Sequence, residues 1–137
     1  MSASTVKEKA TMASTSKKDQ MGQFFGRIFS FNSSLKLYHW HITGKGSYAQ
    51  HMALDQALDD LLDVIDRIVE TSYAVVGDID IVIPETKSPS NIVKHAEDFY
   101  KYAQDQRELF SEDFTAAIID DLQEAIQQLL YRLKRLQ

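Results

Sequence analysis

Five residues in the middle of the chain have side chains of the kinds that bind iron or manganese, namely imidazoles and carboxylates. They are His39, His51, Asp55, Asp66 and Glu70, and successive members are separated by 12, 4, 11 and 4 positions. Residues four positions apart share one face of a helix, so His51 pairs with Asp55 and Asp66 pairs with Glu70. The spacing therefore predicts two pairs of metal ligands on one helix, with His39 supplied by the segment before it.

The distance between the two pairs has a consequence for how many chains a site needs. Eleven residues separate Asp55 from Asp66 and turn a helix by about 1100°, so both pairs point in roughly the same direction. The same eleven residues rise about 16 Å, whereas a metal–carboxylate bond is about 2 Å long. An antiparallel second copy, related by a two-fold axis, places one subunit's first pair opposite the other's second pair. We therefore expect a metal site shared across a homodimer interface.

Each ligand candidate also has a simpler interpretation. Acid pairs four positions apart are usually on a solvated helix face, and the same segment has further acids at Asp59, Asp60 and Asp63. His39 lies in the apolar-rich stretch 35–41, where a single histidine is typically a hydrogen-bonded core residue. Two histidines in the same register as the acids favour the metal site over these alternatives.

The rest of the chain predicts the helices that position these residues. Residues 1–19 are rich in Ser, Thr, Ala and Lys and have no apolar period, which predicts a flexible tail. Residues 20–137 carry apolar residues at three- and four-residue steps, which predicts four helices. They cover about 20–43, the segment after Ser47 as far as 73–77, about 89–109, and the chain from 111 onward. Ser47 and Ser88 are expected N-caps. The sequence thus predicts an all-α, ferritin-like four-helix bundle with a long crossover between helices two and three.

The crossover itself contains a strand-like pattern. Residues 78–84 alternate β-branched side chains with acids, as a short strand does. A lone strand has no pairing partner in a helical chain, so we expect an extended connection over the bundle.

Composition excludes several classes of protein. A hydrophobic content of 44%, with only 5 glycines and 2 prolines, indicates a helical globular chain. The absence of cysteine excludes disulfides, thiolate zinc sites and a cysteine nucleophile. No apolar run approaches the roughly 18–20 residues of a membrane span. We expect a soluble, cytoplasmic protein.

The motif His39-Trp40, Gly44, His51-x3-Asp55, Asp66-x3-Glu70 resembles the signature of the Dps family, the DNA-protecting mini-ferritins. The motif covers residues 38–70, and the helix layout extends the resemblance more loosely to residue 137. It implies a di-iron ferroxidase centre in which His39, His51 and Asp55 of one subunit combine with Asp66 and Glu70 of its two-fold mate. The implied enzyme oxidises ferrous iron, with hydrogen peroxide as the usual oxidant.

The resemblance also implies a homo-oligomer, a hollow shell of twelve subunits built from two-fold dimers, which stores ferric iron and protects DNA. Trp40 matches the tryptophan beside the family's site, and the resemblance implies that it acts as an electron donor or radical trap. It is an equally good interpretation that Trp40 is a large aromatic side chain of the core. The chain departs from the family in two places. Residues 73–88 are too short and too β-branched for the family's extra helix, and His41 replaces a common asparagine.

Association with DNA depends on the tail. Residues 1–20 hold four lysines against one glutamate and one aspartate, a net charge of +2, so only many tails on one shell would bind DNA well. Such binding would make the protein nucleoid-associated.

The alternative function is a non-catalytic structural or DNA-associated bundle protein of the same fold. A bundle metalloenzyme with its site inside one subunit would need Glu-x-x-His motifs, which the sequence lacks.

Overall fold

The computed structural model describes the backbone of residues 3–136 and the side chains of residues 17–136. Four α-helices make up most of this part, and a short 3-10 helix, η1 (Arg107–Leu109), precedes the last of them. The helices are α1 (Ala3–His41), α2 (Ser47–Val76), α3 (Ile92–Asp105) and α4 (Asp113–Arg135). No strand occurs among the described residues. The expected all-α, four-helix architecture is confirmed.

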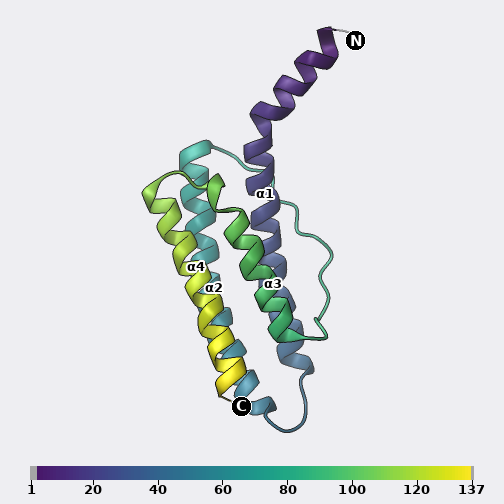
Figure 1. The fold of residues 1–137 in the computed structure, drawn as a ribbon, viewed down its shortest axis with the longest axis vertical. Coiled ribbons are helices and arrows are strands. Elements are labelled where there is room, and N and C mark those ends of the chain that lie inside the picture. Colours follow the sequence, from purple (N-terminus) through teal and green to yellow (C-terminus); the bar gives the residue numbers. More distant parts are fainter. Residues whose placement is uncertain (1–2, 137) are drawn as a thin grey trace.

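The helices pack side by side with alternating directions. In Figure 1, α1 and α4 run downward while α2 and α3 run upward, so the packed pairs α1–α2, α2–α4 and α3–α4 are antiparallel. Their apolar stripes meet in one core, which the hydrophobic effect stabilises. Its most deeply buried large side chains are Phe24, Phe25, Ile28, Leu35, Leu54, Leu61, Ile68, Ile119, Leu122, Ile126, Leu129 and Leu133.

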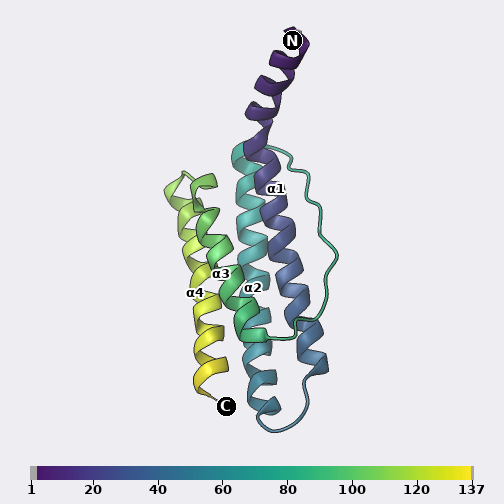
Figure 2. The same cartoon turned by 45° about the vertical axis from the view of Figure 1, so that its right-hand side comes forward.

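A long connection, residues 77–91, joins the end of α2 to the start of α3. It has neither helix nor strand, and it runs along the outside of α1 in both views (Figures 1 and 2). The connection lies so close to α1 that a Cβ atom on Gly22 would overlap the carbonyl oxygen of Asp80. A Cβ atom on Gly26 would overlap that of Val82 in the same way. Glycine at these two positions therefore permits the close approach.

Side-chain contacts hold the same connection in place. Ile79 is buried, and its carbonyl accepts a hydrogen bond of 2.8 Å from the Tyr73 hydroxyl. The hydroxyls of Ser30 and Thr86 lie 2.7 Å apart, which fixes the far end of the connection to α1. The expected connection without a strand is thus present, and it contains no extra helix in the described structure.

Several helix boundaries differ from the expected ones by a few residues. Gly46, with a left-handed φ of 82°, is the N-cap of α2, so Ser47 is its first residue rather than its cap. Helix α3 begins at Ile92 and not near Pro89, because the Asn91 side chain caps it by accepting the Lys94 N–H. Helix α3 also ends at Asp105, and η1 follows where the expected helix continued.

The beginning of α1 also differs from expectation. The predicted flexible tail covered residues 1–19, but the backbone of residues 3–19 is helical and continuous with the rest of α1. This segment has no glycine or proline to interrupt a helix, so α1 extends backward through it. Figure 1 shows it projecting beyond the other helices. Two of the expected DNA contacts, Lys7 and Lys9, lie outside the residues whose side chains the structure describes.

None of the described helices is both long enough and apolar enough to cross a membrane.

Candidate metal centre

The candidate centre lies where the last turn of α1 faces the first three turns of α2. His39 follows the buried Leu35 by four positions, so the same face of α1 carries both side chains inward. Only 6% of the His39 side chain is exposed. His51 and Asp55 share one face of α2, and 44% of each side chain is exposed. The centre is thus closed on the α1 side and open to solvent on the α2 side.

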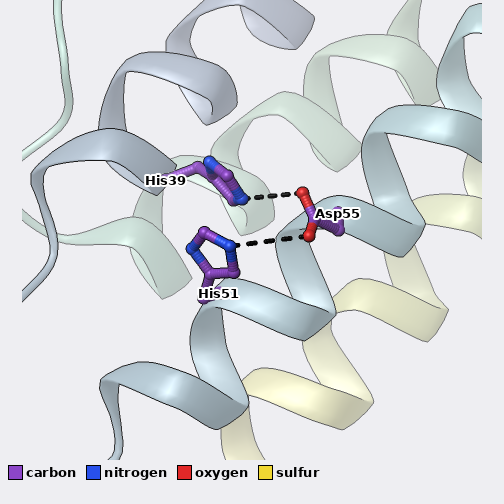
Figure 3. Close-up of side chains that lie close together, drawn as sticks. All are labelled: His39, His51 and Asp55. Carbon is purple, nitrogen blue, oxygen red and sulfur yellow. Dashed lines mark ion pairs between the residues drawn. The ribbon is translucent and has the colours of Figure 1, made fainter.

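Asp55 contacts both histidines, one through each carboxylate oxygen (Figure 3). Its Oδ1 lies 2.7 Å from Nε2 of His39, and its Oδ2 lies 3.6 Å from Nε2 of His51. The two imidazole rings are stacked, with centroids 3.7 Å apart and planes inclined by 28°. One ligand atom from each of these three residues can be chosen so that all lie within 4.8 Å of one another.

This arrangement fits a metal ion. Both ring nitrogens of His39 are buried; Nδ1 has no hydrogen-bond partner among the described residues, and Nε2 lies 2.7 Å from the Asp55 carboxylate. Buried imidazole nitrogens are normally paired, and a metal ion would give one of them a partner. Two imidazoles and one carboxylate suit a divalent transition metal, but three ligands leave coordination positions open. Among the described residues, this is the one cluster of metal-binding side chains.

Electrostatics keep His39 in the form that binds metals. Burial lowers the pKa of His39 below its ordinary 6.5, and the nearby His51 and Lys36 lower it further, against the opposing effect of the Asp55 carboxylate. The imidazole is therefore neutral near pH 7 and has a lone pair to donate.

The other two ligand candidates lie elsewhere on α2. Asp66 and Glu70 are both exposed, and neither belongs to the cluster around Asp55. The eleven residues from Asp55 to Asp66 are continuous helix, so the rise of about 16 Å applies. The structure thus brings together His39, His51 and Asp55 and leaves the acidic pair on the open face of the same helix.

Trp40 is 69% exposed, so its interpretation as a core aromatic is wrong. Position 40 points away from the core because it follows the inward-facing His39 by one residue, or about 100° of helix. The ammonium of Lys36 lies 5.5 Å from the centroid of the Trp40 ring, within range of a cation–π contact. Lys36 is a residue that sequence reasoning missed. Its position three residues before His39 is the signal that could have indicated it.

Comparison with protein families identifies the family to which this chain belongs. Comparisons with curated proteins and with solved structures found no match. One family model matches residues 41–133. The matched range contains His51, Asp55, Asp66 and Glu70 but begins after His39. Since the match covers more than half of the chain, the protein belongs to DUF5856, a family of unknown function.

Proposed function

We propose that this protein is a Dps-like ferroxidase that oxidises ferrous iron at sites shared by two subunits and stores the ferric product. The observation that supports this most directly is the cluster of His39, His51 and Asp55, in which Nδ1 of His39 is buried without a hydrogen-bond partner among the described residues. The sequence resemblance adds Asp66 and Glu70 as the ligands from the second subunit. In this proposal the fold is the ferritin-like bundle, with residues 77–91 as its crossover.

The roles of the residues follow from their chemistry. His39, His51 and Asp55 bind ferrous iron as substrate on one side of the interface. Asp66 and Glu70 of a second copy contribute further oxygen ligands, which stabilise the harder ferric product, and Glu70 bridges the two irons. Two ferrous ions give up one electron each, and one peroxide molecule with two protons accepts both electrons to form two water molecules. The two substrates of hydroxyl-radical formation are removed in the same step.

The family resemblance extends the proposal to assembly and location. We propose a cytoplasmic shell of twelve subunits that protects DNA chiefly by removing ferrous iron and peroxide. Trp40, exposed one residue after His39, would be placed to donate an electron when only one iron is bound.

The direct test is ferrous oxidation by the purified protein. Absorbance of the ferric product should rise faster in the presence of peroxide and protein than with peroxide alone. His51→Ala should remove most of this acceleration, since it deletes an imidazole ligand. A matched control is His95→Ala, because His95 lies on α3 outside the cluster. Equal rates with wild-type protein and with buffer would favour the alternative, a structural bundle protein that oxidises nothing.

DNA binding is a separable part of the proposal. Deleting residues 1–19 should leave iron oxidation close to wild type, because this segment has no histidine and ends 20 positions before His39 on α1. If the tails bind DNA, the deletion should weaken binding in a gel-shift assay and flatten its salt dependence. Unchanged DNA binding would place the contact on the folded surface.

A further inference from the structure

A groove of about 490 Å³ lies between α1 and α2 beside the candidate metal centre. Asp55 belongs to both, so the groove and the centre are continuous. Helix α1 contributes Phe29, Asn32, Ser33 and Lys36 to the groove, and α2 contributes Asp55, Leu58, Asp59 and Leu62.

The open face of α2 next to the groove has a symmetric spacing. It includes the half-exposed or exposed residues His51, Asp55, Asp59, Leu62, Asp66 and Glu70. Their steps of 4, 4, 3, 4 and 4 residues read the same in both directions along the helix. At about 100° per residue, all six lie within a sector of about 100°, so they form one stripe. Two antiparallel copies related by a two-fold axis can pair such a stripe with itself, because each position then faces its mirror position on the other copy.

The symmetry specifies which positions face each other. The centre of the stripe lies between residues 60 and 61. His51 therefore faces Glu70 of a second copy, Asp55 faces Asp66, and Leu62 faces Asp59. The first two pairs complete the metal site of the proposed function. The third pair brings Leu62 of each copy to the groove that the other copy's Asp59 lines.

We propose that the groove receives Leu62 of a second copy of this chain, and that this contact is the centre of the dimer interface. The inference rests on the proposed function, since the two-fold axis was placed by its ligand pairs. It adds the residue that holds the two copies together between the two metal sites. Leu62 is 49% exposed in the single chain, and Phe29 in the groove is 42% exposed, so both sides have apolar surface to bury.

The charges that line the groove also suit a second copy of the chain. Lys36 is the one cation that lines the groove, whereas the stripe carries four acids on each copy. Acids facing acids weaken the metal-free dimer, so metal binding should strengthen self-association by linkage.

The first experiment compares two matched leucines by sedimentation velocity of the full chain in chelator. Leu62→Glu replaces the side chain proposed to enter the groove with one that the facing acids repel, and Leu136→Glu makes the same change at a leucine of similar exposure, 51%, after the end of α4. Leu62→Glu should weaken self-association at least tenfold or release monomers, while Leu136→Glu should resemble wild type. Unchanged assembly of Leu62→Glu, or equal loss in both variants, would overturn the proposal. Circular dichroism would verify that both variants remain helical.

A second experiment does not depend on a disruptive substitution. The chain has no cysteine, so any engineered disulfide must form between the introduced residues. A mixture of Asp59→Cys and Leu62→Cys chains should form covalent mixed dimers under mild oxidation, because these positions face each other. A mixture of Asp59→Cys and Leu136→Cys chains should not. Equal cross-linking in the two mixtures would contradict the proposed register.

The two proposals can fail separately. Mixed disulfides and loss of assembly in Leu62→Glu, together with no iron oxidation by wild type, would support the interface and refute the ferroxidase. Iron oxidation by wild type with full assembly and activity of Leu62→Glu would support the ferroxidase and refute the interface.

Discussion

Sharing of the metal site between two subunits can be tested by mixing two inactive variants. One chain carries His51→Ala and Asp55→Ala, and the other carries Asp66→Ala and Glu70→Ala. Each variant alone lacks one half of every site. In a mixed dimer, one site combines both defective halves and the other combines both intact halves. A mixed dimer therefore keeps one of its two sites.

The size of the recovery follows from this count. Random reassociation of equal amounts makes about half of the dimers mixed, so about a quarter of wild-type sites should return. Dimers purified through a different affinity tag on each chain should recover about half. The assay is the initial rate of ferrous oxidation by peroxide, normalised to protein, with each variant alone as the control. The reason for complementation is the helical rise of about 16 Å that separates the two pairs.

One outcome would refute this reasoning. If mixed dimers verified by both tags showed no more activity than either variant alone, the two ligand pairs would not act in one site. Activity in the variant that lacks Asp66 and Glu70 would indicate that His39, His51 and Asp55 suffice within one subunit.

Three further predictions concern single residues. Asp55→Asn should lower ferrous oxidation at least about tenfold by weakening metal binding, whereas Asp60→Asn, about 140° away on α2, should leave the rate unchanged. Gly26→Ala should lower the free energy of unfolding in urea by about 1–3 kcal/mol, because its Cβ overlaps the crossover, while the exposed Gln23→Ala should not. Burial lowers the pKa of His95 below 6.5, so the unfolded chain protonates first and stability falls as pH decreases through 6.5 toward the folded pKa. His95→Gln should therefore lose less melting temperature than wild type between about pH 7.5 and pH 5.5, and an equal loss would contradict this.

The sequence predicted the parts of this structure that depend on periodicity. The recurrence of apolar residues at three and four positions indicated four helices, and the spacing of His51 and Asp55 placed them on one face of α2. The position of His39 beside His51 and Asp55 depends on how α1 packs against α2. Residue spacing alone does not determine this packing, so His39 was expected at the site only because of the family motif.

Other features were not predictable because they arise from contacts distant in sequence. Gly22 and Gly26 allow residues 77–91 to lie against α1, and nothing in the sequence next to them indicates this role. The start of α3 differed for a local reason, because the side chain of Asn91 caps the helix and Ser88 does not. The groove beside Asp55 requires two helices to exist, and no property of α2 alone indicates it.

Measurement of ferrous iron oxidised per peroxide consumed, in wild type and in His39→Ala, tests the central claim most directly. We predict that wild-type protein oxidises two ferrous ions for each peroxide molecule, faster than buffer does, with no hydroxyl radical detected by a spin trap. His39→Ala should lose the acceleration, since it removes the buried imidazole of the cluster, whose Nε2 lies 2.7 Å from the Asp55 carboxylate. A wild-type rate equal to that in buffer, or an unchanged rate in His39→Ala, would contradict the assignment of the ferroxidase centre to these residues.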